Sequence, residues 1–271
     1  MVRAGASVSL PTFVTEEAFD AGATVTLGEE AAHHMRVRRL DAGMPVGLLD
    51  GAGRRGTGVL TLLAKRHATV SVERVDEVSP AAAIHLLLPV ADKDRMLWLA
   101  EKATELEVAS WRPVLYRRSR HVSPRGEGPT FHQKVQARIA GALEQSRGAW
   151  APMVFPEAPL AQALAAAPEG IRLVLEQGGT PIAEALASRA PDFAAARVAG
   201  GLPPAIVLAV GPEGGFEPAE LEDLRGAGFA PCAVGRTILR FETAAVAGVA
   251  AARTALETVA PAAPTADQGD A

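Results

Sequence analysis

Two charged residues near the carboxyl end of the chain could take part in catalysis. The run VGRTILRFETAAVAG carries Arg240 and Glu242, two positions apart and next to a glycine-containing turn. An arginine can stabilise negative charge that develops in a transition state, and a carboxylate can orient that arginine or act as a general base. The apolar neighbours Ile238 and Leu239 suggest that Arg240 is buried, which is rare for an arginine that is neither paired nor functional. The purely structural alternative is an ion pair of Arg240 with Glu242 or Glu213.

A second glycine-containing turn lies earlier in the sequence. Ile206–Val210 is a short apolar run, typical of a strand buried on both faces of a parallel sheet, and GPEGGF follows it directly. Pro218 then stands where the first turn of a helix tolerates proline. Turns of this kind at the carboxyl ends of parallel strands form the ligand crevice of α/β sheets, and their glycines let the backbone approach a ligand. The alternative is that these glycines only shape a strand-to-helix connection.

Three other candidate motifs give only weak evidence for a cofactor, metal or catalytic site. GAGRRG at residues 51–56 matches the dinucleotide pattern GxGxxG, but strand-like sequence follows it where a helix is required, which predicts a hairpin loop. His33 and His34 have no partner at zinc-ligand spacing, so we expect no metal site. Cys232 is the single cysteine, and we expect it to fill a core position rather than act as a nucleophile.

The composition indicates a globular protein that works in a reducing compartment. Apolar residues make up 48% and charged residues 21% of the 271 residues, and both values are ordinary for such proteins. One cysteine cannot form an internal disulfide, no apolar run reaches the ~20 residues of a membrane-spanning helix, and residues 1–20 lack the apolar stretch of a secretory signal. We therefore expect a cytoplasmic protein with no membrane partner.

Charge is unevenly distributed along the chain. The net charge of −4 argues against indiscriminate binding of nucleic acid. The segment 33–74 is nevertheless rich in basic residues, and residues 111–126 contain five arginines and no acid. Local basic clusters on an acidic protein favour a selective polyanion binder, with solvated charged faces as the alternative.

The sequence divides into two regions and a tail. Residues 1–79 are rich in short strand-like runs, with one helix at about 29–39, which favours a small barrel. The strands expected there are 46–51, 58–64 and 68–75. From residue 80 to 259, strand-like and helix-like runs alternate, which indicates βαβ units and a parallel sheet. Residues 260–271 are rich in alanine and proline, and we expect a disordered tail.

Hydrophobic periodicity predicts the elements of the second region. Helices at 94–108 and 131–146 each place apolar residues along one face. Thr243 can cap the N-terminus of a long alanine-rich final helix. The strands expected in this region are 84–90, 114–116, 171–176, 206–210 and 233–234.

Five sequence blocks together resemble a known family. GPEGGF and GRTILRFETA resemble the signature of the SPOUT, or trefoil-knotted, methyltransferases. HHMRVRRLDAG and VGLLDGAG near the N-terminus resemble the PUA-like barrel of the RsmE-type enzymes, which methylate N3 of a uridine in 16S, small-subunit, ribosomal RNA. KDRMLWLAEKATELEV and EQSRGAWAP resemble the two blocks between them. The blocks occur in the right order, so the resemblance covers the chain except for its tail.

The resemblance implies an α/β methyltransferase domain with a deep trefoil knot, preceded by a small PUA-like β-barrel that binds RNA. It also implies S-adenosylmethionine as the cofactor, held in the knot, and a homodimer formed through the knotted domain. The implied cofactor-binding residues are Leu175, Gly178, Gly211, Pro212, Glu213, Gly214, Gly215, Val234, Gly235, Ile238, Leu239, Arg240 and Thr243.

An RNA substrate then suggests roles for the charged residues. Arg240 would stabilise negative charge on the uracil oxygens, and Glu242 would either orient Arg240 or accept the N3 proton; the sequence does not decide between these roles. Gly148 stands where the family commonly has an arginine, and Arg147 lies one position earlier in this chain. The arginines expected to contact RNA phosphates are Arg36, Arg38, Arg54, Arg55, Arg117, Arg118, Arg120 and Arg147.

Three alternative functions are consistent with some of the same sequence features. A SPOUT-like methyltransferase could act on another RNA position, and a protein with a non-functional knot could serve only in RNA binding or ribosome assembly. An oxidoreductase that uses residues 51–56 would instead bind NAD.

Overall fold

The computed structural model describes residues 10–119, 129–199 and 201–259. The chain forms two compact units. The first comprises Met1–Pro80 and Ile139–Ala151, and the second comprises Ala81–Arg138 and Pro152–Ala271. The inclusion of residues 139–151 in the first unit is not visible in the sequence. The tail expected at residues 260–271 lies outside the described residues.

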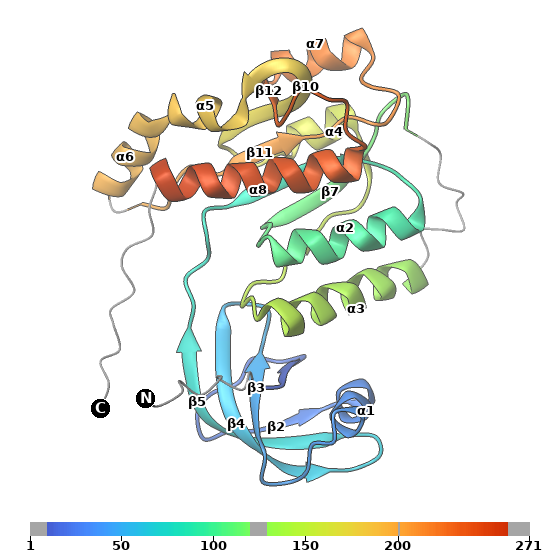
Figure 1. Ribbon diagram of the computed structural model, residues 1–271, viewed down its shortest axis with the longest axis vertical. Helices are drawn as coiled ribbons and strands as arrows, with labels where there is room; N and C mark the ends of the chain where they lie inside the picture. The colour runs from blue at the N-terminus through green and yellow to red at the C-terminus, as the bar shows by residue number, and fades with distance from the viewer. Residues whose placement is uncertain (1–9, 120–128, 200, 260–271) are drawn as a thin grey trace, which may run out of the picture. The chain divides into compact units, whose positions relative to one another are not determined.

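The first unit is built on a five-stranded mixed sheet with strand order β1-β3-β4-β5-β2 (Figure 1). Alternate side chains of the long strands point inward, so that Leu60 and Val70 pack with Phe13, Leu48 and Met35 in one core. The strands and the helix expected here are confirmed. Their bounds are β1 Thr12–Val14, β2 Thr24–Leu27, α1 Glu29–Val37, β3 Pro45–Leu49, β4 Arg54–Leu63 and β5 Ala68–Glu77.

The GAGRRG motif belongs to a hairpin, as predicted: residues 51–53 lie in its loop, and Arg54 begins the second strand. Strands β3 and β4 pair antiparallel on either side of this loop. The carboxylate of Asp50 accepts hydrogen bonds from the backbone N–H of Ala52 at 2.7 Å and of Arg54 at 2.9 Å, a side-chain-to-backbone turn typical of aspartate. Since no helix follows the motif, it lacks the context of a dinucleotide-binding turn.

The segment after helix α3 (Pro129–Ser146) completes the first unit. The indole Nε1 of Trp150 donates to the Val78 carbonyl at 2.9 Å, and the Gly53 N–H donates to the Ala149 carbonyl at 2.9 Å. Gly53 has a φ of 107°, and a Cβ at this position would stand 2.5 Å from the Trp150 ring. Only glycine fits there, because both the backbone conformation and the ring exclude a side chain.

The second unit is built on a seven-stranded parallel sheet with the order β12-β10-β11-β6-β7-β8, and β9 pairs with β7 (Figure 1). Every residue of β11 is buried, as expected for a central strand of a parallel sheet. The strand bounds are β6 Ile84–Pro89, β7 Ser110–Leu115, β8 Met153–Val154, β9 Ala158–Pro159, β10 Ile171–Pro181, β11 Ile206–Ala209 and β12 Ala230–Ala233.

Helices cover both faces of this sheet. Val207 on β11 packs in a cluster with Ala163 and Leu224, whereas Leu208 points to the opposite face. A Cβ on Gly248 would stand 2.9 Å from the Leu208 side chain, so α8 packs closely on that second face. The helix bounds are α2 Lys93–Glu105, α4 Leu160–Ala165, α5 Ile182–Ala187, α6 Ala190–Val198, α7 Pro218–Gly226 and α8 Phe241–Val259.

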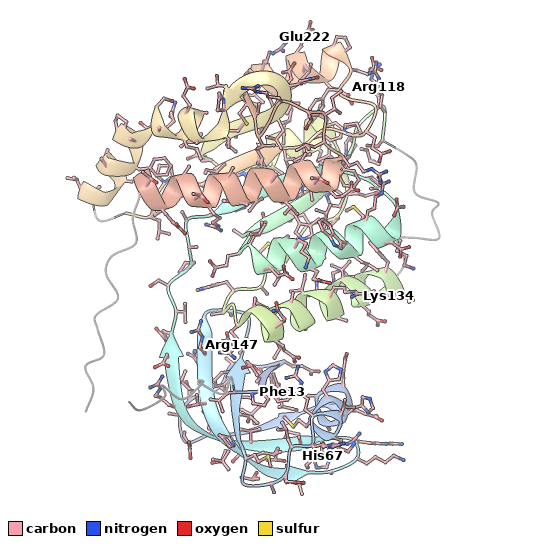
Figure 2. All side chains as sticks on the ribbon, viewed as in Figure 1. Phe13, His67, Arg118, Lys134, Arg147 and Glu222 are labelled. Atoms are coloured by element: carbon pink, nitrogen blue, oxygen red, sulfur yellow. The ribbon has the colours of Figure 1, made fainter. Side chains whose placement is uncertain are left out.

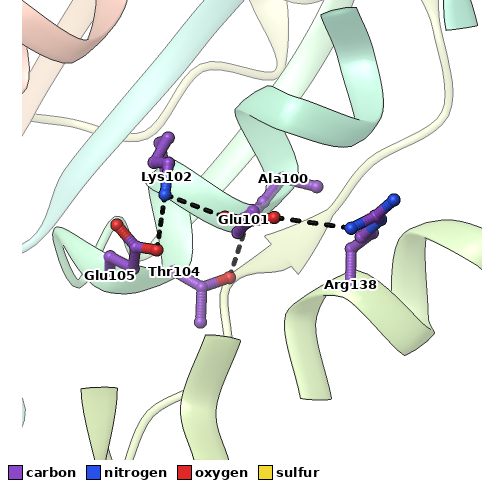
Figure 3. Close-up of polar contacts among 6 residues, drawn as sticks. All are labelled: Ala100, Glu101, Lys102, Thr104, Glu105 and Arg138. Atoms are coloured by element: carbon purple, nitrogen blue, oxygen red, sulfur yellow. Dashed lines mark hydrogen bonds and ion pairs between the residues drawn. The ribbon is translucent and has the colours of Figure 1, made fainter. Parts of the chain in front are cut away.

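Helix α2 is fixed at its start and along its exposed side. The Asp92 carboxylate accepts from the Arg95 backbone N–H at 3.1 Å and thereby caps the helix. Figure 3 shows Lys102 Nζ between Glu101 at 2.8 Å and Glu105 at 2.7 Å, with Arg138 of α3 at 3.6 Å from Glu101. The hydrogen bonds that Lys102 donates to Glu101 and Glu105 raise its pKa.

The final helix begins two residues before the predicted cap. Helix α8 starts at Phe241, and the Ala244 N–H already donates to the Arg240 carbonyl at 2.8 Å. The assignment of Thr243 as N-cap is therefore wrong, since Thr243 lies inside the first turn. Burial of Phe241, which is 4% exposed, fixes the start of the helix. None of the described helices is long and apolar enough to cross a membrane.

Candidate active site

A pocket of about 470 Å³ lies beside the carboxyl ends of β10, β11 and β12, the edge at which α/β sheets bind ligands. Residues from three separate segments line it, and the structure brings the two glycine-containing turns together in its wall. The sequence-predicted residues that line it are Leu175, Gly211, Pro212, Glu213, Gly214, Gly215, Val234, Gly235, Ile238 and Leu239.

Several residues of the pocket wall were missed in the sequence. Glu176 and Gln177 follow Leu175 directly in the EQGG run, so their position next to glycines was an available signal. Val210, Phe216, Ala233 and Thr237 likewise adjoin the two glycine-containing runs, whereas the rest reach the pocket through the fold. The rest are Leu221, Cys232, Phe241 and Ala244.

The first elbow, residues 211–217, is a rigid turn that leads into α7. The Gly215 N–H donates to the Pro212 carbonyl at 2.8 Å, and Gly215 has a φ of 73°, a conformation that favours glycine. Glu217 and Glu220 form a capping box at the start of α7, in which the Glu220 carboxylate accepts from the Glu217 N–H at 2.8 Å. Pro218 occupies the first helical turn as predicted.

Two of the predicted RNA-binding arginines support this elbow. Arg118, labelled in Figure 2, donates from Nε to Glu217 at 2.6 Å and from Nη1 to the Gly214 carbonyl at 2.7 Å. The backbone N–H of Arg117 donates to Glu220 at 2.7 Å. Residues 117–118 therefore fix the position of the first elbow, while the side chain of Arg117 is exposed.

The second elbow, residues 234–240, is more open than the sequence suggested. Ile238 is 83% exposed and Arg240 is also exposed, so the expectation of a buried Arg240 is wrong. The apolar neighbours Ile238 and Leu239 do not establish burial of Arg240, since apolar atoms contribute much of any protein surface. Within the described ranges Arg240 makes no ion pair, so the pairing with Glu242 or Glu213 considered from the sequence is absent there.

The partner of those two carboxylates is an arginine that the sequence analysis did not single out. Arg95 in the first turn of α2 forms an ion pair with Glu213, and its Nε lies 3.8 Å from Glu242 Oε1. The other oxygen of Glu242, Oε2, is buried and has no hydrogen-bond partner among the described residues. Glu242 thus has one oxygen near a cation and the other buried without a hydrogen-bond donor among the described residues.

Three predicted cofactor-binding residues do not line the pocket. Gly178 borders an adjacent cavity of about 640 Å³, which shares Val234 and Gly235 with the main pocket. Arg240 and Thr243 are also outside the lining of the main pocket, and both are exposed on the surface of the second unit.

The single cysteine lies in the pocket wall but is fully buried. Burial raises the pKa of Cys232 to about 12, so its thiol stays protonated near neutral pH. The prediction that Cys232 fills a core position is confirmed. In the described part of the chain, no group of three His, Cys, Asp or Glu side chains could hold a metal ion.

In the first unit, the structure brings two of the predicted RNA-binding arginines together. Arg55 Nη2 donates to the Arg147 carbonyl at 3.1 Å, and both side chains are exposed (Arg147 in Figure 2). Arg147 has a φ of 61°, a left-handed conformation that directs the chain out of α3. These two arginines form a basic pair between the 51–56 loop and the end of α3.

The remaining predicted arginines of the first unit are separate from that pair. Arg36 donates to the Ala64 carbonyl at 2.7 Å, and Arg54 pairs with Asp20 at 2.9 Å. The Arg38 guanidinium lies 5.9 Å from the centre of the Phe13 ring. Arg120, the last of the predicted set, lies outside the described residues.

A parallel sheet covered on both faces, with a glycine-lined pocket at its carboxyl edge, defines an α/β protein that binds a small ligand. The chain belongs to the RNA methyltransferase family, since residues 78–253 match the RNA methyltransferase domain. Residues 27–73 match the RNA methyltransferase PUA domain. The expected α/β fold with a preceding PUA-like region is confirmed.

Known relatives agree with the resemblance found in the sequence blocks. The ribosomal RNA small subunit methyltransferase E of Synechocystis is 29% identical over 241 residues, which cover 87% of this chain and 75% of the relative. The protein of the same name from Mycobacterium bovis is 29% identical over 244 residues, covering 86% of this chain and 87% of the relative.

Solved structures show the same fold with a ligand. The ribosomal RNA small subunit methyltransferase E of Neisseria gonorrhoeae, bound to S-adenosylmethionine, is 29% identical, with a TM-score of 0.75 over 93% of this chain and 98% of that chain. A Legionella pneumophila methyltransferase with the same bound cofactor is 25% identical, with a TM-score of 0.77 over 92% of this chain and 98% of that chain.

Proposed function

We propose that this protein transfers a methyl group from S-adenosylmethionine to N3 of a uridine in 16S ribosomal RNA. The observation that carries the proposal is the pocket formed by the two glycine-containing elbows, with Arg240 at the end of the second elbow and Glu242 two residues later in the chain. The relatives named ribosomal RNA small subunit methyltransferase E support the RNA class, and their Neisseria homologue with bound S-adenosylmethionine supports the cofactor.

The pocket fits the size and charge of S-adenosylmethionine. Its volume of about 470 Å³ lies in the range of roughly 300–1,000 Å³ that is usual for small-molecule sites. Four glycines in the lining expose backbone N–H and C=O groups that can hydrogen-bond a nucleoside. Glu176 and Glu213 in the same wall complement a ligand that carries positive charge. Leu239 and Phe241 offer apolar surface for the adenine ring.

Bound S-adenosylmethionine supplies an electrophilic methyl group, so the residues of the protein must orient the uracil and remove its N3 proton. N3 gains the methyl group as the carbon–sulfur bond breaks, and the proton leaves N3 for an acceptor on the protein. Negative charge that develops on the uracil oxygens as N3–H weakens would be stabilised by a nearby arginine. Arg240 is exposed and, among the described side chains, makes no ion pair that would occupy it.

Glu242 is the proposed proton acceptor. A buried acceptor without a hydrogen bond is costly, and the imide N3–H of a uridine is a donor that would satisfy the unpaired Oε2. The other oxygen faces Arg95 rather than Arg240. This arrangement favours proton transfer to Glu242 over a role in orienting Arg240.

Arginines of both units are proposed to bind RNA phosphates. Arg55 and Arg147 lie together and exposed in the first unit, and Arg117 is exposed beside the first elbow in the second. Arg118 is already engaged by Glu217 and Gly214, so its proposed role is to support the elbow as well as to contribute positive charge. Arg36, Arg38, Arg54 and Arg120 remain proposed phosphate contacts.

The remaining parts of the proposal follow from family membership. We propose that residues 1–79 form an RNA-binding PUA-like domain and residues 80–259 the methyltransferase domain, in which the elbows belong to a deep trefoil knot. We also propose a homodimer formed through the knotted domain, acting in the cytoplasm on the small ribosomal subunit or its RNA.

Nucleoside mass spectrometry of small-subunit ribosomal RNA from cells with and without this gene tests the function. The proposal expects 3-methyluridine to be lost at one position and restored by the intact gene. Loss of a different methylated nucleoside would identify a methyltransferase with another target. An unchanged set of nucleosides would contradict a methyltransferase function and favour a role in RNA binding alone.

A further inference from the structure

Arg95 lies where three carboxylates from three different segments converge. Its Nε is 3.1 Å from Asp92, the capping residue of α2, and 3.8 Å from Glu242 in the first turn of α8. Its Nη1 forms a hydrogen-bonded ion pair with Glu213 in the first elbow. One planar guanidinium therefore connects the start of α2, the first elbow and the first turn of α8, which directly follows the second elbow.

The Arg95 side chain is held in place on several sides. It is 25% exposed, and its guanidinium lies 5.8 Å from the centre of the Phe241 ring, a cation–π distance. The hydrogen bond with Glu213, followed by the charges of Glu242 and Asp92, raises the pKa of Arg95. The arginine therefore stays charged near neutral pH.

We infer that Arg95 is a positioning residue that holds the two elbows together and orients Glu242 toward the substrate. The inference deepens the proposed methyl transfer and rests on it for the role of Glu242. The role in holding the elbows together follows from the contacts of Arg95 alone.

Charge explains why this position requires an arginine. Without Arg95, the carboxylates of Asp92, Glu213 and Glu242 would lose the cation that they share, and like charges this close repel. A lysine carries the same charge at a single point, whereas the guanidinium presents several donors in a fixed plane. Lysine could therefore retain one of the three pairs but not all of them.

The geometry of Glu242 gives Arg95 a second role. The pair with Arg95 fixes one carboxylate oxygen of Glu242 and leaves Oε2 buried and without a partner in the described part of the chain. A carboxylate held at one oxygen can present the other in one defined direction. Loss of Arg95 would let Glu242 rotate and would lower the fraction of molecules in which Oε2 faces the uracil.

Hydrogen exchange of the protein without ligands tests the holding role directly. We expect Arg95→Gln to increase amide exchange in peptides that cover residues 211–217 and 238–242, and Arg95→Lys to give a smaller increase. Lys102→Gln is the matched control, because Lys102 lies on the same helix and pairs only with Glu101 and Glu105 among the described residues; it should leave both peptides unchanged. Unchanged exchange in Arg95→Gln would overturn the inference whether or not the protein methylates RNA.

Kinetics test the orienting role. At saturating S-adenosylmethionine and RNA, we expect Arg95→Gln to lower turnover at least tenfold and Arg95→Lys to lower it less, with a melting temperature that shows both variants folded. Because Arg95 acts through Glu242, Arg95→Gln combined with Glu242→Gln should be no slower than Glu242→Gln alone. Fully additive losses, or a normal rate in Arg95→Gln, would contradict this role. A wild-type protein that transfers no methyl group would instead contradict the proposed function and leave the exchange result as the test of Arg95.

Discussion

Gly179 lies directly against the backbone of Cys232. A Cβ at Gly179 would stand 2.7 Å from the Cys232 nitrogen and 2.8 Å from its Cα. This contact arises from a bulge in β10, where both Leu175 and Thr180 pair with Cys232 and the residues between them loop out. The looped residues include Glu176 and Gln177 of the pocket wall, so the close approach shapes the proposed cofactor site.

Replacement of Gly179 by alanine should therefore damage cofactor binding. The atoms that meet the added methyl group belong to backbone and cannot rotate away, and overpacking of this kind costs about 1–3 kcal/mol. We expect the Kd for S-adenosylmethionine, measured by calorimetry, to rise about tenfold or more. Gly226→Ala is the control, because a Cβ there meets nothing within 4 Å and should leave the Kd unchanged. Equal affinity in the two variants would contradict the importance of this contact.

Arg240 should matter for the rate and not for cofactor binding. It is exposed and lies outside the pocket lining, so Arg240→Ala should keep the affinity for S-adenosylmethionine. Removal of a single transition-state donor typically lowers turnover by ~10² or more, and we expect that loss in single-turnover methylation of small-subunit RNA. Arg189→Ala, an exposed arginine paired with Asp192 at 2.6 Å, should retain full activity. Normal turnover in Arg240→Ala would rule out the assigned role.

Local sequence patterns were sufficient for most of the longer strands and for the two elbows. They did not predict the short strands β1, β2, β8 and β9, and they placed β12 at 233–234 instead of Ala230–Ala233. Ile206–Ala209 is a continuous apolar run, Ile84–Pro89 is apolar except for His85, and both form central strands of the parallel sheet. Glycine and proline mark the first elbow because its turn requires a positive φ at Gly215 and a helix start at Pro218. These are properties of a few consecutive residues, so they can be read from the sequence alone.

The features that the sequence did not reveal depend on distant contacts. Arg95 is 118 positions from Glu213, and no local pattern indicates that they pair. Burial of Arg240 was inferred from Ile238 and Leu239, but Ile238 is exposed and Leu239 only half-buried in the second elbow. The assignment of residues 139–151 to the first unit depends on the Trp150 hydrogen bond to Val78, 72 positions away.

Acid should destabilise the second unit through His85. Its Nδ1 lies 2.7 Å from the Ser110 hydroxyl, and burial lowers the pKa of His85 below its ordinary value near 6.5. The unfolded chain therefore binds this proton more readily, so the stability contributed by neutral His85 is present above about pH 6.5 and is lost as the pH falls toward the folded pKa.

Urea unfolding at pH 7.5 and pH 5 measures this effect. The free energy of unfolding should fall less on acidification in His85→Gln than in the wild type, because glutamine has no proton to gain. His67→Gln, at an exposed histidine of the first unit (Figure 2), should keep the wild-type decrease. An equal decrease in His85→Gln and wild type would show that another group is responsible.

Arg117 should contribute to RNA affinity through charge. Its side chain is exposed and, within the described ranges, free of ion pairs. We expect Arg117→Gln to weaken RNA binding and to reduce the slope of log K against log salt by roughly 0.7–0.9, the value for one phosphate contact. Arg189→Gln should leave the slope unchanged. A wild-type slope in Arg117→Gln would remove this residue from the proposed RNA surface.

The most direct test is to incubate the purified protein with small-subunit ribosomal RNA and S-adenosylmethionine that carries a deuterated methyl group. Mass spectrometry of the digested RNA then reports any nucleoside that has gained the label. We predict deuterated 3-methyluridine, and much less of it with Arg240→Ala. The absence of label from every nucleoside, with RNA from subunits that lack the modification, would contradict the assignment of the glycine-lined pocket as a methyl-transfer site.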